Sequence, residues 1–135
     1  MKKVLLISLS ALALAACQQP SNSTSAPVAM RTAIAGIPRA LYFVYSVDHA
    51  CNSAGDNVIR VVQAPVHGKL SINAVSDYPD FAPSAAFHTC NTTQVAGKKL
   101  VYTADRGYSG TDSVAVQVIY AGGVERTYSF NLNVK

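Results

Sequence analysis

From residue 36 onward, apolar residues alternate with polar ones or form short β-branched and aromatic runs, which Gly, Pro, Asn and Asp separate. Successive side chains of a β-strand point to opposite faces of the sheet, so an apolar period of two residues predicts a half-buried strand. The pattern is clearest over residues 113–120 and 124–134. The alternating apolar positions there are Val114, Val116, Val118, Tyr128, Phe130, Leu132 and Val134.

Shorter runs of the same kind predict four earlier strands, over residues 41–47, 58–63, 69–73 and 99–103. Between the last two strands, Ala121-Gly122-Gly123 supplies the positive φ that a tight hairpin needs. No segment shows an apolar period of 3.6 residues over the length of a helix. Several short strands separated by turns therefore predict one all-β domain, an antiparallel β-sandwich.

The least regular segment is residues 74–97, which contains Pro79, Pro83 and Cys90. We expect a long loop there, with one short helical turn near residues 84–87. A loop of this length is entropically costly to order, so it calls for a covalent staple or a function.

The chain begins as an export signal. Lys2 and Lys3 precede an uncharged apolar run over residues 4–16, which is too short to span a bilayer comfortably and is typical of a signal peptide. The run ends in Leu14-Ala15-Ala16-Cys17, which resembles the lipobox of bacterial lipoproteins. The resemblance implies cleavage before Cys17 and acylation of this cysteine with palmitate-like chains; two or more such chains anchor a protein stably. The alternative is an ordinary secretory signal that happens to end at a cysteine.

These features divide the chain into a signal peptide (1–16), a lipid-anchored linker (17–35) and a sandwich domain (36–135). The linker is polar and contains Ser and Pro, as flexible tethers do. Gln18 follows the predicted lipid-bearing cysteine. In lipoproteins of enterobacteria-like species, a residue other than Asp at this position usually directs the protein to the outer membrane. We therefore expect a location in the cell envelope, at the outer membrane.

The charge of the chain bears on its partner, and its cysteine content bears on covalent cross-linking. Without residues 1–16, nine Lys and Arg stand against seven Asp and Glu, and the basic residues are scattered. This balance argues against nucleic acid as a partner. Cys51 and Cys90 remain as an even pair in an exported protein, which predicts a disulfide.

Three segments occur in an order that resembles the bacterial immunoglobulin-like and cadherin-like repeats of surface proteins. They are Ala64-Pro65-Val66-His67-Gly68-Lys69-Leu70, Leu100-Val101-Tyr102-Thr103 and Gly107-Tyr108-Ser109-Gly110-Thr111-Asp112-Ser113-Val114. The resemblance covers residues 58–134 and implies an immunoglobulin-like sandwich in an envelope setting. Unlike the usual long arrays of such repeats, this chain has one copy, a cysteine pair and the insert at 74–97. The resemblance assigns no ligand.

The residues of this motif have structural roles in our interpretation. Gly68 suits a tight turn between the second and third predicted strands, and Gly107 and Gly110 suit backbone conformations that exclude a Cβ. Asp112 is expected to accept hydrogen bonds from backbone N–H groups of the turn that contains these two glycines. Tyr108 is expected to cover the end of the core.

Two histidines stand two residues before the paired cysteines, in His49-Ala50-Cys51 and His88-Thr89-Cys90. If the cysteines meet as thiolates, the four side chains make a tetrahedral zinc or copper site. The alternative is a disulfide with two incidental surface histidines, because thiols outside the cytoplasm usually oxidise. We favour the disulfide and expect no cofactor.

Catalytic chemistry has few candidates. Ser109, His67 and Asp112 are residue types of a nucleophile, a base and an orienting acid, but Ser109 does not lie in a strand-to-helix elbow. Asp77 and Asp80 are a possible acid–base pair, although acids in a loop are usually solvated. The motifs of phosphate loops, metalloproteases and dinucleotide sites are missing from the sequence. We therefore expect no enzymatic activity.

Three aromatic residues, Tyr78, Phe81 and Phe87, lie in the predicted loop rather than in an alternating strand. They either anchor a partner, as exposed aromatic residues on loops often do, or fold back into a small satellite core. We predict a non-enzymatic envelope lipoprotein that acts as a binding or structural module through loop 74–97, with a protein or glycan partner. The alternatives are an exported inhibitor of a lysozyme-like enzyme and a metal-handling lipoprotein that uses His49 and His88.

Overall fold

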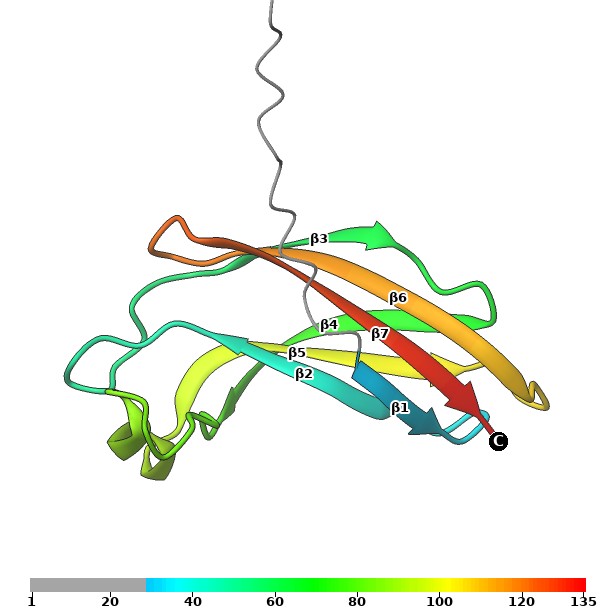
Figure 1. Cartoon of the computed structure of the whole chain (residues 1–135), viewed down its shortest axis with the longest axis horizontal. Coiled ribbons are helices and arrows are strands. Elements are labelled where there is room, and N and C mark those ends of the chain that lie inside the picture. The colour runs from blue at the N-terminus through cyan, green and yellow to red at the C-terminus, as the bar shows by residue number, and fades with distance from the viewer. Residues whose placement is uncertain (1–28) are drawn as a thin grey trace, which may run out of the picture.

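A computed structural model of the chain describes residues 29–135 (Figure 1). The predicted signal peptide, the predicted lipid-bearing Cys17 and the linker up to residue 28 lie outside the described residues. The part that the structure describes has no helix long and apolar enough to cross a membrane.

Seven strands and one short 3-10 helix make up this part of the chain. They are β1 (Ala29–Ala33), β2 (Arg39–Tyr45), β3 (Val58–Gln63), β4 (Gly68–Asp77), η1 (His88–Thr92), β5 (Val95–Ala104), β6 (Gly110–Ile119) and β7 (Glu125–Val134). One sheet has the order β1-β7-β6-β3 and the other the order β2-β5-β4. The two sheets pack face to face, which confirms the predicted immunoglobulin-like sandwich (Figure 1).

The core lies between the two sheets and follows the predicted alternation. In β6 and β7, the alternate positions Val114, Val116, Val118, Phe130, Leu132 and Val134 are at most 3% exposed. The facing sheet contributes Leu41 and Val44 from β2 and Leu100, Tyr102 and Ala104 from β5. Period two in the sequence thus becomes a single apolar face on each sheet.

The first strand was not predicted. β1 lies within the expected linker of residues 17–35, so the folded domain begins before residue 36. It pairs with β7 in parallel, with Ala29 opposite Phe130 and Ala33 opposite Val134, although we expected a wholly antiparallel sandwich. The strand has little apolar alternation because it is held mainly by backbone pairing at the edge of β7. Among residues 30–33 of this strand, only Ala33 is fully buried, at 2% exposure.

The expected loop of residues 74–97 is shorter than predicted. Residues 74–77 belong to β4 and residues 95–97 to β5, where Ala74 pairs with Lys98 and Asp77 with Val95. The remaining connection, residues 78–94, is called the stapled segment below. Its helical turn is η1, four residues later than the turn expected near 84–87. Backbone hydrogen bonds extend both strands past the point where apolar alternation stops.

Three connections meet at one end of the sandwich: residues 46–57 between β2 and β3, the stapled segment, and the hairpin 120–124 between β6 and β7 (Figure 1). The β3–β4 turn, the β5–β6 turn and the C-terminus lie at the other end. The first end is called the cleft end below. Loops held on a rigid sandwich are common places for recognition.

Candidate binding cleft

The predicted disulfide is confirmed. Cys51 and Cys90 are joined with an S–S distance of 2.03 Å and a Cα–Cα distance of 5.2 Å. The bond fixes η1 of the stapled segment to the β2–β3 connection, and Cys90 is only 1% exposed. Because both sulfurs are in the disulfide, they do not form the thiolate metal site that was the alternative.

His49, in the β2–β3 connection, and His88, in η1, each contact a residue of the stapled segment and do not form a shared site with the sulfurs. The ring of His49 lies 5.3 Å from the ring of Phe87. Nδ1 of His88 lies 3.1 Å from the carbonyl oxygen of Phe81. Within residues 29–135, no three His, Cys, Asp or Glu side chains come together as potential metal ligands. The contacts of His49 and His88 are therefore those of residues that shape a loop.

Hydrogen bonds hold the stapled segment together, and a ring contact joins it to β2. The Asn91 side chain makes two hydrogen bonds with the backbone of Phe81: it accepts one from the N–H at 2.9 Å and donates one to the carbonyl oxygen at 2.9 Å. The Phe81 ring meets Tyr45 edge-on at 5.3 Å and lies 5.8 Å from Phe87. Tyr45 in turn lies 5.0 Å from Phe43. These rings form the satellite cluster that was one of the two predicted arrangements.

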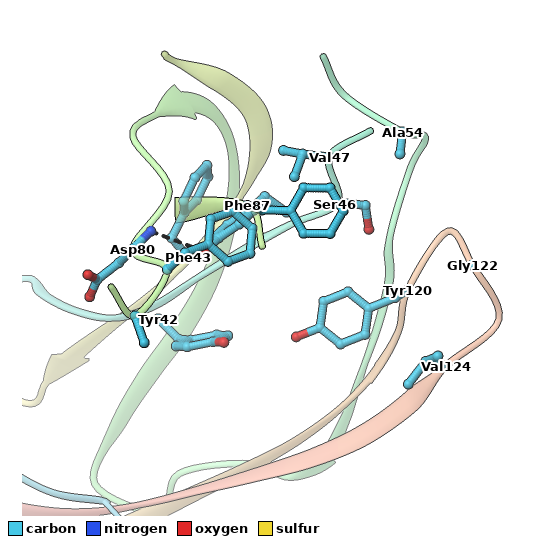
Figure 2. A pocket seen from close by; sticks show the side chains of 13 residues that line it. Tyr42, Phe43, Ser46, Val47, Ala54, Asp80, Phe87, Tyr120, Gly122 and Val124 are labelled. Atoms are coloured by element: carbon cyan, nitrogen blue, oxygen red, sulfur yellow. Dashed lines mark hydrogen bonds between the residues drawn. The ribbon is translucent and has the colours of Figure 1, made fainter. Parts of the chain in front are cut away.

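The same rings also line a cleft of about 670 Å³ between the stapled segment, the start of the β2–β3 connection and the β6–β7 hairpin (Figure 2). Six of its lining residues are aromatic: Tyr42, Phe43, Tyr45, Phe81, Phe87 and Tyr120. Concave sites with apolar walls and a few polar groups are the usual form of ligand sites in proteins.

Three tyrosines join the two sheets beside this cleft. The Tyr42 hydroxyl donates to that of Tyr128 at 3.4 Å, and the hydroxyls of Tyr120 and Tyr128 lie 2.6 Å apart. In Figure 2 the hydroxyls of Tyr42 and Tyr120 point toward each other across the cleft. Burial raises the pKa of Tyr42 and of Tyr120 well above the usual value for tyrosine. Both rings therefore stay neutral at physiological pH.

Asp80 is the one charged residue among those lining the cleft. Its backbone N–H donates to the Tyr45 hydroxyl at 3.1 Å, and burial raises the pKa of Tyr45. The Asp80 carboxylate makes no ion pair or hydrogen bond within residues 29–135. The ion pairs in that range join Lys98 to Asp56 and Lys99 to Asp77.

Two of the three predicted binding residues, Phe81 and Phe87, belong to the cleft lining. Tyr78 is 52% exposed and is not part of it. Sequence reasoning missed Tyr42 and Tyr120. A signal was present in residues 42–45, where aromatic side chains occupy both faces of one strand, more than a single core face requires.

At the opposite end of the sandwich, Asp112 holds the β3–β4 turn. Its carboxylate accepts the N–H groups of Val66 at 3.0 Å, His67 at 2.9 Å and Ser113 at 2.8 Å, and the hydroxyl of Tyr102 at 2.9 Å. The expected donors were in the 107–110 turn. Burial alone would raise the pKa of Asp112, but these donors outweigh it and hold the pKa below its usual value.

The possible catalytic residues at this end do not assemble into a nucleophile–base chain. The Ser109 hydroxyl donates to the carbonyl of Val134 at 3.4 Å. The His67 ring stacks on Tyr108, with centroids 4.1 Å apart and an interplanar angle of 13°. Asp112 is engaged by the donors described above. Near the cleft, Asp77 is likewise taken up by Lys99 rather than paired with Asp80.

The motif glycines mark places where a side chain has no room or the backbone is left-handed. A Cβ on Gly68 would lie 2.6 Å from the Thr103 carbonyl oxygen and 2.7 Å from the Tyr102 ring. Gly68 is thus required by a close approach at the start of β4 rather than by turn geometry. Gly107 and Gly110 have φ of 80° and 145°.

The sequence matches no protein-family model and no curated protein sequence. Among solved structures, it is similar to the solution structure of Amebosin, with 13% sequence identity and a TM-score of 0.38. That similarity covers 78% of this chain and 88% of the other. Similarity at this level supports no inference about function.

Proposed function

We propose that this protein is a non-enzymatic binding module of the cell envelope and that it contacts its partner through the cleft and the stapled segment. The observation that supports the proposal is the convergence of six aromatic rings on one cleft, from β2, the stapled segment and the end of β6. These parts of the chain are far apart in sequence and are brought together by the fold.

The construction of the cleft favours binding over packing alone. Phe81 and Phe87 remain half-buried although the disulfide, Asn91 and neighbouring rings hold them in place. Rings fixed before a partner arrives lose little conformational entropy on binding, which favours affinity. Aromatic residues of this kind are common anchors in interfaces.

The envelope setting of the proposal rests on the lipobox resemblance. Eleven residues, 18–28, separate Cys17 from β1. Even when fully extended, a connection of this length reaches only about 40 Å. Acylation at Cys17 would therefore keep the domain close to the membrane surface, and its partner would be a protein or glycan of the same compartment.

The lipid anchor is directly testable. In bacteria that are given labelled palmitate, the full-length protein is expected to incorporate the label and to sediment with the membranes. Cys17→Ala is expected to abolish both, because this thiol is the proposed acylation site. Cys17→Ser serves as a second variant. Labelling that persists in both variants would contradict the proposed anchor.

The binding surface can be tested by photo-crosslinking in living cells. A photoreactive residue replaces either Val124, which lines the cleft and is 53% exposed, or Val66, which is 77% exposed in the β3–β4 turn at the opposite end. We expect discrete covalent adducts from position 124 and none from position 66, detected by immunoblotting. Equal adducts from both positions, or none from position 124, would count against the cleft as the binding surface.

A further inference from the structure

We infer that the cleft receives a cationic side chain, the guanidinium of Arg or the ammonium of Lys, from a basic segment of a protein partner. The inference rests on the proposed function and names the chemistry of the same site. It follows from five properties of the cleft end: the nature of its walls, their hydrogen-bonding capacity, the charge of its lining, the charge distribution around it and the volume of the cleft.

The walls are made largely of neutral aromatic rings. In Figure 2, Tyr42 lies below the cleft, Tyr120 at its side, and Phe43 and Phe87 above it. A cation within roughly 6 Å of a ring centroid is attracted by the ring quadrupole, and Arg also stacks on such rings through its flat guanidinium. Several rings around one space therefore favour an organic cation.

Hydrogen-bonding capacity points in the same direction. The Tyr42 hydroxyl is the donor to Tyr128, so its oxygen retains the capacity to accept hydrogen bonds. Arg and Lys side chains carry several N–H donors and no acceptor, so they match such oxygens. A quaternary ammonium group has no N–H donor and would leave them unused.

The lining carries one negative charge and no positive one. Asp80 is the single charged lining residue, and its carboxylate has no partner within residues 29–135. An anionic ligand would meet both this carboxylate and the electron-rich ring faces. A cation gains from both.

The surroundings of the cleft are acidic although the domain as a whole is weakly basic. Lys98 and Lys99 are neutralised in ion pairs with Asp56 and Asp77. Beyond these pairs, the loops and strand ends of the cleft end carry Asp48, Asp80 and Glu125 against Arg60 and Arg126, an excess of one negative charge. Excess negative charge acts over about 10 Å at ordinary salt and raises the local concentration of cations.

The volume of the cleft favours a protein partner over a free small cation. About 670 Å³ holds more than one side chain, so neighbouring residues of the partner would enter with the Arg or Lys. The rims are loop segments, which leave the cleft open to an extended chain.

The test is an NMR titration of the full-length protein with a blocked Gly-Arg-Gly peptide at low salt. The matched control replaces Arg with citrulline, which keeps the planar shape and three of the five N–H donors but has a carbonyl oxygen in place of one amino group and no charge. We expect the Arg peptide to shift resonances of Tyr42, Phe87 and Tyr120, and to bind roughly tenfold more tightly than the citrulline peptide. Added salt should reduce the difference.

Substitutions test whether the Arg peptide binds in the cleft. Asp80→Asn and Tyr120→Leu are each expected to weaken binding of the Arg peptide several-fold, because one removes the carboxylate and the other a ring face. Asp105→Asn removes an exposed carboxylate at the opposite end and is expected to leave the affinity unchanged. Equal effects of Asp80→Asn and Asp105→Asn would show that only net charge matters and would overturn the inference.

Other outcomes also overturn it. Equal binding of the Arg and citrulline peptides, or no cleft shifts with the Arg peptide, would exclude a cation site. A neutral N-acetylglucosamine oligomer that shifts Tyr42 and Tyr120 where the Arg peptide does not would identify a glycan cleft. The proposed function would survive that result, whereas failure of crosslinking from position 124 would remove the function itself.

Discussion

Loss of the disulfide is expected to lower the free energy of unfolding by about 4 kcal/mol, because the unfolded chain then regains the entropy of a loop of roughly forty residues. Cys51 and Cys90 are 39 residues apart in sequence. The measurement is urea unfolding of the oxidised wild type, of the reduced wild type, and of a Cys51→Ser, Cys90→Ala double variant. Alanine is chosen at position 90 because a hydroxyl there would be buried without a planned partner.

The slope of the unfolding curve separates two mechanisms. If the staple acts through the unfolded state, its removal exposes more surface on unfolding, so the m-value rises while stability falls. A loss below about 1 kcal/mol with an unchanged slope would show that Asn91 and the aromatic contacts hold the stapled segment without the bond. In the reduced protein, we also expect weaker binding of the Arg peptide, because two walls of the cleft are no longer fixed to each other.

How far the fold could be predicted depended on how locally each element is encoded. Strands β6 and β7 were predictable because their apolar positions alternate over about ten residues. Such alternation within a single strand is enough to predict which of its faces is buried. The disulfide between Cys51 and Cys90 was predictable from the expected export of the protein and from the even number of cysteines that remain after residue 17. The sequence of β1 has no such alternation, because this strand is held in place by backbone pairing with the edge of β7.

The cleft was only partly predictable, for a different physical reason. Phe81 and Phe87 were noticed because they lie outside any alternating strand. Tyr42 and Tyr120 were assigned to strands, and their meeting through Tyr128 depends on how one sheet lies over the other. Sequence periodicity describes one element at a time, so it does not reveal rings that converge from different sheets.

Asp112 shows the same limit. Its place in a Gly-rich motif suggested donors close in sequence, yet two of its donors belong to a turn 45 and 46 residues earlier in the chain. A carboxylate that bonds across the sandwich fixes one connection against another strand. The energetic role of this residue therefore becomes visible only in the folded structure.

Asp112→Asn is expected to lower the free energy of unfolding by about 3 kcal/mol at neutral pH, because hydrogen bonds to a charged acceptor are strong and lost partners remain desolvated. Asp112 is 8% exposed, and its two oxygens accept from the backbone and from Tyr102. An asparagine keeps only one acceptor oxygen and turns an N–H donor toward other donors. Asp105→Asn, on the exposed turn nearby, is the matched control and is expected to change stability little.

The pH dependence gives this prediction its sharpest test. The pKa of Asp112 is lower in the folded protein than in an unfolded chain. Its stabilising contribution is therefore complete above the unfolded value, near pH 4, and is lost as the pH falls through the folded pKa. The stability gap between wild type and Asp112→Asn should be wide at pH 7 and should narrow as the pH falls through the folded pKa, where wild-type Asp112 also becomes neutral. A gap that stays constant over this range would mean that shape, rather than the charged hydrogen bonds, makes Asp112 important to the β3–β4 turn.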